Sequence, residues 1–323
     1  MTRGIKPAAR RLGVLASVAA LALTLAGCGG GGIQSTTAAG GKSCGTVNMA
    51  LNAWVGYTAD AYVIGNVLEQ KLGCTVNYVK LAEQPSWAGM ANGTVDTIVE
   101  NWGHPDLVSK YIDQEHVVQD AGLTDNTGVI GWFVPPWMAQ KYPDITDWHN
   151  LNKYASLFKT SESGSQGQLL DGDPSYVTND QALVTNLHLN YKVVVGGSEA
   201  ALIQSFRTAE ANKTPLLAYF YEPQWFFSEM KLVKVNLPKY TPGCDSDPAK
   251  VACDYPPYKL NKLISSKFAS SGSPAVQVIK NFHWTNDDQN EVAKAIAKDG
   301  QTPDQAAQAW ISAHSSQVDA WLK

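Results

Sequence analysis

Residues 47–81 read VNMALNAWVGYTADAYVIGNVLEQKLGCTVNYVKL. The stretch begins with a β-rich run at 47–53 and ends with another at 75–81. Between them, residues 59–72 have a helical pattern whose apolar face holds Ala61, Ile64, Val67 and Leu68. Two strands joined through a helix run parallel in one sheet, so the stretch predicts a β-α-β unit.

The same alternation continues along the chain. A helix at 85–92, a strand at 97–100 and a departing strand at 128–134, which the following PPW stops, complete a first α/β unit. A second unit is expected to contain helices at 144–158, with Asp147 as N-cap, at 178–187, and at 198–210, capped by Ser198. Its strands are expected at 166–174, 191–197 and 215–220.

The last part of the chain is expected to return to the first unit. A strand pattern starts at Leu232, and helices are predicted at 288–298 and 302–322, the second opening with Thr302-Pro303. Trp310 and Trp321 lie at helical spacing in the second and are interpreted as packing residues. These patterns predict two α/β lobes, residues 44–128 with 232–323 and residues 129–231, with a ligand cleft at the strand ends between them.

The N-terminal segment has the layout of an export signal, with basic residues followed by an apolar run that is short for a membrane span. It ends in Leu25-Ala26-Gly27-Cys28, which resembles the lipobox of bacterial lipoproteins. The expectation is a signal peptide at 1–27 and, at 28–43, a lipidated Cys28 with a flexible tether. The alternative is an ordinary cleaved signal with a chance cysteine. The body would then be held by lipid on the extracytoplasmic face of the cell membrane.

The four cysteines that follow Cys28 predict two disulfides, because exported chains keep them. Cys44 and Cys74 each come just before a predicted strand, and parallel neighbouring strands place such residues side by side. Cys244 and Cys253 bracket a loop and pair most simply with each other. A metal site is the competing interpretation, but no CxxC and no nearby histidine supports it.

Composition and motifs exclude several function classes. The net charge of -4 comes from mixed signs without a basic cluster, which argues against nucleic acid as a partner. The chain contains no GxSxG, HExxH, GxxxxGK[ST] or dinucleotide GxGxxG, so neither an enzyme mechanism nor a cofactor is expected.

Aromatic residues stand at the ends of predicted strands, where a cleft is expected. They are Trp54, Trp102, Tyr176, Tyr221 and Trp225. Each ring alone suits a core, but convergence of several in one cleft gives the cation-π cage that a quaternary ammonium ion needs. In the run AYFYEPQWFF (218–227), strand alternation assigns Phe220 to packing, with Phe226 and Phe227, and leaves Tyr221 and Trp225 at the cleft.

The turn DGDPSYVTND (171–180) precedes a predicted helix and offers a second half to the site. Backbone N-H groups of Val177 and Thr178 at the start of that helix suit a carboxylate. Alternatively the segment is simply a well-capped turn. A cage and a carboxylate site together predict a zwitterion with a methylated ammonium group.

From Val47 to the C-terminus the chain resembles the substrate-binding proteins of glycine betaine/choline/carnitine (quaternary ammonium) ABC importers. The resemblance lies in WAGMANGTVD, ENWGHPD, GDPSYVTND, YFYEPQW and NDDQNEVAKAIAKDG. It implies a two-lobe periplasmic-binding-protein fold, type II-like, with a hinge and a ligand cleft between the lobes. It also implies cage roles for Trp102, Tyr176 and Tyr221, and for Trp54 as in one branch of the family.

That branch carries an acidic residue two positions after the tryptophan, and here Gly56 stands in its place. Neither Glu100 nor Glu222 is assigned to replace it.

The expected function is therefore capture of a quaternary ammonium osmolyte, first of all glycine betaine, by a monomeric receptor that serves a membrane permease and its ATPase. Choline, carnitine and ergothioneine are the alternatives within the same fold. A secreted carbohydrate-active hydrolase remains a rival if Glu100 and Glu222 face each other across the cleft. A further rival is a surface adhesion lipoprotein that binds no ligand.

Overall fold

The computed structural model describes residues 43–323. The expected signal peptide, Cys28 and nearly all of the tether lie outside these residues. The strands are β1 (Thr46–Leu51), β2 (Thr75–Lys80), β3 (Thr97–Asn101), β4 (Val118–Val134), β5 (Gly167–Asp171), β6 (Tyr191–Val195), β7 (Ala218–Glu222), β8 (Val233–Lys234) and β9 (Tyr258–Ser265).

The helices are α1 (Val55–Leu72), α2 (Glu83–Asn92), α3 (Pro105–Val108), α4 (Pro136–Lys141), α5 (Leu151–Tyr154), α6 (Asp180–Asn186), α7 (Glu199–Asn212), α8 (Ser266–Ala269), α9 (Ala275–Asn281), α10 (Asn286–Ala297), α11 (Pro303–Ala313) and α12 (Ser315–Trp321). Shorter 3₁₀ or π turns are η1 (Ser109–Gln114), η2 (Pro143–Thr146), η3 (Trp148–Asn150), η4 (Ala155–Phe158) and η5 (Trp225–Ser228).

Strand β4 is shared by two groups of strands. The strand order is β2-β1-β3-β9-β4-β7-β5-β6, with β8 also on β4. Residues 118–128 of β4 pair with β9, and residues 129–133 pair with β7. The first group is parallel where the sequence predicts it, among β1, β2 and β3, while β9 runs antiparallel to both of its neighbours. The result is the two-lobe α/β arrangement, with a mixed sheet in each lobe.

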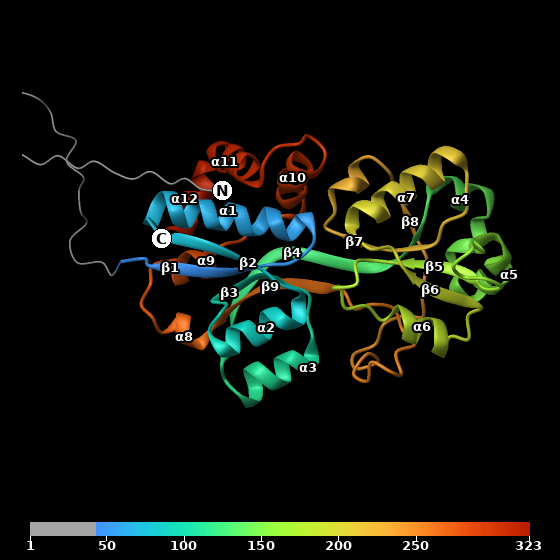
Figure 1. Cartoon of the computed structure of the whole chain (residues 1–323), viewed down its shortest axis with the longest axis horizontal. Coiled ribbons are helices and arrows are strands. Elements are labelled where there is room, and N and C mark those ends of the chain that lie inside the picture. The colour runs from blue at the N-terminus through green and yellow to red at the C-terminus, as the bar shows by residue number, and fades with distance from the viewer. Residues whose placement is uncertain (1–42) are drawn as a thin grey trace, which may run out of the picture. The chain divides into compact units, whose positions relative to one another are not determined.

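Helices cover both faces of each sheet (Figure 1). In the first lobe α1, α10, α11 and α12 lie on one side, and α2 and α3 lie on the other. Trp310 and Trp321 stack at 5.8 Å between ring centroids and are buried, which confirms their packing role. In the second lobe α6 and α7 lie on opposite sides.

Capping residues explain several helix boundaries. Ser198 caps α7 by accepting from the N-H of Ala201, as the sequence predicts. Helix α11 starts after Thr302, also as predicted, and Thr302 forms a capping box with Gln305 there. The N-cap predicted at Asp147 is confirmed, because its carboxylate accepts from the N-H of His149. The single helix predicted at 144–158 is wrong, because the backbone is extended at Asp147 and this cap opens only a short 3₁₀ turn. That region is a series of short turns instead.

The chain returns to the first lobe later than expected. The strand pattern at Leu232 forms β8, which pairs with Phe133 and Val134 of β4 in the second lobe. Beyond it, the Tyr255 hydroxyl accepts from the N-H of Asn179 in that lobe. Pairing with the first sheet resumes only at β9, so the strand starting at Leu232 does not re-enter the first lobe.

The structure contains the disulfides Cys44–Cys74 and Cys244–Cys253. The first joins the starts of β1 and β2, where Thr46 stands opposite Thr75 in the ladder. Its Cα atoms are 4.9 Å apart because parallel neighbours begin side by side. The second closes the loop that precedes β9.

Candidate ligand-binding site

A cavity of about 590 Å³ opens where the strand ends of the two lobes face each other. The first lobe contributes Trp54 after β1 and Trp102 after β3. The second lobe contributes Tyr176, which follows β5, and Tyr221 of β7. The volume is that of a small-molecule site.

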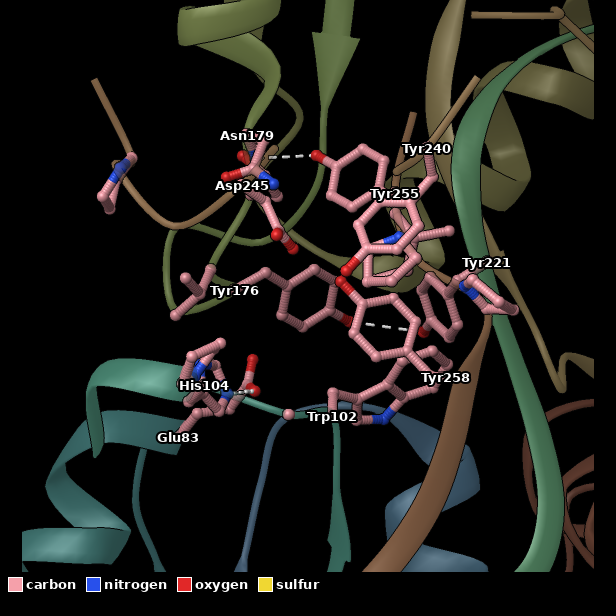
Figure 2. A pocket seen from close by; sticks show the side chains of 18 of the residues that line it. Glu83, Trp102, His104, Tyr176, Asn179, Tyr221, Tyr240, Asp245, Tyr255 and Tyr258 are labelled. Atoms are coloured by element: carbon pink, nitrogen blue, oxygen red, sulfur yellow. Dashed lines mark hydrogen bonds and ion pairs between the residues drawn. The ribbon is translucent and has the colours of Figure 1, made fainter. Parts of the chain in front are cut away.

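These four rings contact one another. Ring centroids are 5.7 Å apart for Trp54 and Tyr176, 6.0 Å for Trp102 and Tyr221, and 6.0 Å for Tyr176 and Tyr221, all near-perpendicular. Figure 2 shows Trp102 rising from the end of β3 toward Tyr221 and Tyr258, while Tyr176 enters from the facing loop. The structure thus brings together four of the five aromatic residues that the sequence predicts.

Two glycines make room for these rings. A Cβ on Gly128 of β4 would lie 2.6 Å from the indole of Trp102. A Cβ on Gly172, just after β5, would lie 2.5 Å from the ring of Tyr176. Any larger residue at either position would displace a ring from the cavity wall.

The fifth predicted aromatic residue lies elsewhere. Trp225 begins η5, does not line this cavity, and packs against Phe226 and the guanidinium of Arg207, which is 5.8 Å from its ring centroid. The turn after Pro223 carries the indole away from Tyr221. The prediction that Trp225 faces the same ligand does not fit this position, whereas Phe220 and Phe226 are fully buried, as packing residues should be.

Glu100 lies directly behind the two indoles. Its Oε1 accepts from Nε1 of Trp54 at 3.1 Å and from Nε1 of Trp102 at 2.6 Å. Its Oε2 accepts from Nε2 of Gln289 in α10 at 2.9 Å. The residue is 3% exposed. No role is predicted for Glu100 from the sequence, yet this residue fixes the positions of Trp54 and Trp102, half of the cage.

The turn at 171–180, which the sequence predicts to bind a carboxylate, has a different relation to the following helix than predicted. Helix α6 starts at Asp180, so Val177 and Thr178 precede the helix and are not its first residues. Both line the cavity, and within residues 43–323 neither backbone N-H has a hydrogen-bond acceptor. The Thr178 hydroxyl donates to Asp171 at 2.9 Å.

Other cavity residues were missed by sequence reasoning. Tyr240 and Tyr255 line the cavity from the segment between β8 and β9, and Tyr258, the first residue of β9, lines it as well. The Tyr-Pro-Pro-Tyr run at 255–258, two residues after Cys253, is the signal that marks Tyr255 and Tyr258. Among the ionisable side chains at the wall, acids outnumber bases: Glu83, Asp106 and Asp245 against His104 and Lys259. This balance favours a ligand with a positive charge.

Glu199, the first residue of α7, reaches across to the other lobe. Its Oε2 accepts from the N-H of Val55, the first residue of α1, at 2.8 Å. Its Oε1 accepts from Gln224 at 2.9 Å. A carboxylate at the N-terminus of an eighteen-residue helix is favourably placed, so this contact stabilises the lobes in their present arrangement.

A buried acid in the second lobe makes stability depend on pH. Asp180 accepts from Nε1 of Trp132 at 2.8 Å and from the Tyr255 hydroxyl at 2.7 Å. Burial raises the pKa of Asp180 to about 8, and the charge of Asp171 contributes. The folded protein therefore retains a proton that the unfolded chain releases near pH 4. This stabilisation is complete below about pH 4 and is lost as pH rises to about 8.

We expect the free energy of unfolding to fall between pH 5 and pH 8, with Asp180 contributing at most about 1.4 kcal/mol per pH unit. Urea unfolding of wild type and Asp180→Asn at several pH values measures this contribution. The slope of the variant should be shallower, and equal slopes would contradict the role of Asp180.

A cavity lined by rings from two α/β lobes defines a small-solute-binding protein of the periplasmic-binding-protein type. Residues 45–313 match the family described as the substrate-binding domain of ABC-type glycine betaine transport systems, and the chain belongs to this family. Its members are solute-binding proteins and not enzymes.

Known proteins resemble this chain in sequence or in fold. The trimethylamine N-oxide-binding protein of Pelagibacter ubique is 24% identical over 273 residues, covering 81% of this chain and 86% of the relative. The structure of lactococcal OpuAC, closed and complexed with glycine betaine, has a TM-score of 0.67 at 22% identity, covering 86% of this chain and 99% of that one. A choline-binding protein of an ABC transporter, in complex with choline, has a TM-score of 0.70 at 18% identity, covering 87% and 92%.

The chain is thus an extracytoplasmic substrate-binding receptor of an ABC importer for quaternary ammonium compounds. No helix within the described residues combines the length and apolar character needed to cross a bilayer. The same residues contain no cluster of His, Cys, Asp and Glu suited to a metal ion.

Proposed function

We propose that this receptor captures a trimethylammonium solute, glycine betaine first among the candidates, and delivers it to the permease and ATPase of its importer. In this proposal the protein acts as a monomer and is anchored by a lipid on Cys28, which lies outside the described residues. The ammonium group enters the aromatic cage, and closure of the lobes buries it.

The observation that carries the proposal is the meeting of Trp54, Trp102, Tyr176 and Tyr221 at one cavity. A quaternary ammonium ion donates no hydrogen bond and cannot lose its charge, so ring faces are its suitable partners. Each contributes about 0.5–2 kcal/mol once water is excluded.

Glycine betaine also needs a partner for its carboxylate. The unpaired backbone N-H groups of Val177 and Thr178 lie at the cavity wall and support this role. The ligand's trimethylammonium group would then contact the cage while its carboxylate contacts the turn of the second lobe.

A ligand without a carboxylate is the second candidate, because acids surround the polar end of the cavity. Asp245 lines it directly, and Asp171 lies behind Thr178. Choline fits this surrounding because its hydroxyl can donate to a carboxylate, and a structural neighbour is named for binding choline. Trimethylamine N-oxide also lacks a carboxylate, and a relative in sequence is named for binding it, but its oxygen accepts hydrogen bonds and does not donate them. Carnitine and ergothioneine are larger trimethylammonium compounds that carry a carboxylate, as glycine betaine does.

The hydrolase alternative loses its main support. Such an enzyme needs two carboxylates on opposite sides of the scissile bond. Glu100 is turned toward the indoles, and Glu222, at the end of β7 opposite Val129, does not line the cavity.

Calorimetric titration of the purified body decides among these ligands. The panel is glycine betaine, choline, carnitine, ergothioneine and trimethylamine N-oxide, with glucose and a neutral disaccharide as controls. We expect glycine betaine to bind most tightly and the sugars not to bind. Tighter binding of choline or trimethylamine N-oxide would move the proposal to the second candidate, and failure of every methylated compound would overturn it.

A further inference from the structure

The carboxyl group of Glu100 is held by three donors in a buried position. Two of them are the indole N-H groups of Trp54 and Trp102, which share Oε1, and the third is Gln289 on Oε2. Within residues 43–323, no Lys, Arg or His side chain forms an ion pair with Glu100. If this group is ionised, the protein supplies no counter-ion for it.

A second buried acid determines whether Glu100 is ionised. Asp60 of α1 accepts from the same Gln289 Nε2 at 3.1 Å and is 1% exposed. Burial raises the pKa of Asp60 well above its usual range, and the charge of Glu100 raises it further, while Lys262 opposes this. Burial also raises the pKa of Glu100, but hydrogen bonds from Asp60 and both indoles lower it. The geometry gives the same preference, because both carboxyl oxygens of Glu100 accept from N-H donors, whereas Asp60 accepts from one donor and its Oδ1 has no partner within the described residues. Hydrogen bonding therefore favours the charge on Glu100 and the proton on Asp60.

The geometry connects this charge to the ligand. Each indole has its N-H on Glu100 and its ring at the cavity wall, so a cation at the rings is separated from the carboxylate only by the indoles. An anion that accepts from an indole N-H makes the ring face more negative, which strengthens cation-π attraction. In a site without water the direct attraction between the two charges is also strong.

We propose that Glu100 is the residue that determines selectivity for a full positive charge, acting through the two indoles as the counter-ion of the bound ammonium group. This inference rests on the proposed function and deepens it. The rings alone favour a cation through their π faces, and Glu100 adds the larger part of the preference for a charged group over a neutral group of the same shape. Glu100 is a positioning residue, because it touches no ligand itself.

Isosteric probes separate charge from shape. 3,3-Dimethylbutan-1-ol has the shape of choline with carbon in place of nitrogen, and 3,3-dimethylbutanoate stands in the same relation to glycine betaine. We expect wild type to bind the nitrogen compound of each pair at least about 50-fold more tightly. Equal affinity within a pair would overturn the inference without any variant.

Glu100→Gln removes the charge but keeps an amide oxygen that can accept from the indoles. The affinity for choline or glycine betaine should fall about 10-fold or more, while the affinity for the carbon isostere stays within about twofold. An equal loss for both members of a pair would mean that Glu100 only orients the rings, and no loss would mean that its charge is not used. Near-ultraviolet circular dichroism and thermal unfolding check that the indoles and the fold are retained.

Asp60→Asn is the matched control in the same buried network. Because the proton resides on Asp60, this change leaves the charge on Glu100, and selectivity for the nitrogen compound should stay within about twofold of wild type. If Asp60→Asn reduces selectivity as much as Glu100→Gln does, the charge is not located on Glu100. Binding of any methylated ammonium probe to wild type keeps the proposed function standing, whichever way the variants behave.

Discussion

Trp102→Ala is expected to weaken the binding of trimethylammonium ligands by about 100-fold. The change removes one ring face from the cation, removes the apolar wall next to Tyr221 and Tyr258, and leaves Glu100 without its shortest hydrogen bond. Together these losses amount to about 3 kcal/mol, which corresponds to that factor. Titration calorimetry measures the affinity, and ligand-induced tryptophan fluorescence reports whether the indole signal is lost.

Trp225→Phe is the matched control, because Trp225 is a buried tryptophan of the same chain outside the cavity. Its affinity should stay within about twofold of wild type. Unchanged binding in Trp102→Ala, or a large loss in Trp225→Phe, would show that the cage is placed on the wrong residues. The pair of variants therefore also tests the sequence-based choice of Trp225.

Glu199→Ala is expected to weaken binding by about 10-fold, mainly by faster release of the ligand. The carboxylate is the acceptor for the first N-H of α1 across the lobes, a charge-assisted bond at a helix N-terminus. Losing this hydrogen bond destabilises the closed state by about 1.4 kcal/mol, which corresponds to the expected 10-fold loss of affinity. Stopped-flow fluorescence gives the dissociation rate, and small-angle scattering with saturating ligand reports how far the lobes remain closed.

Glu210→Ala on the same helix serves as control, since Glu210 pairs with Lys213 and the N-H of Trp137 within the second lobe. Release rates and scattering should match wild type in this variant. If ligand dissociates from Glu199→Ala at the same rate as from wild type, the cross-lobe contact does not contribute to closure.

The positions of the cage rings were predictable because they depend on local order. Trp54 and Trp102 each follow a strand of one parallel sheet, so their place in the chain already puts them at the same edge. Tyr221 is the last residue but one of β7, where alternation separates it from Phe220. Trp225 was misplaced because the 3₁₀ turn after Pro223 reorients the chain, and alternation no longer applies there.

The buried charged groups could not be predicted in this way. Glu100 ends an apolar strand, and its partner Gln289 lies 189 residues further along the chain. Strand β9 was missed partly because Lys262 suggests an exposed segment. In the structure this lysine is fully buried and donates to the backbone oxygens of Leu123, Lys280 and Phe282. In both cases distant segments supply the partners that make burial of a charge tolerable.

Strand β4 limits how the ligand specificity of the receptor can change. Gly128 stands on this strand at the point where pairing passes from β9 to β7, and the indole of Trp102 occupies the space that a side chain there would fill. A substitution that reshapes the cage at this point therefore also alters the strand that joins the lobes. Redesign or evolution toward a bulkier solute has a freer route at Tyr240, which lines the cavity from the segment before β9 and leaves β4 untouched.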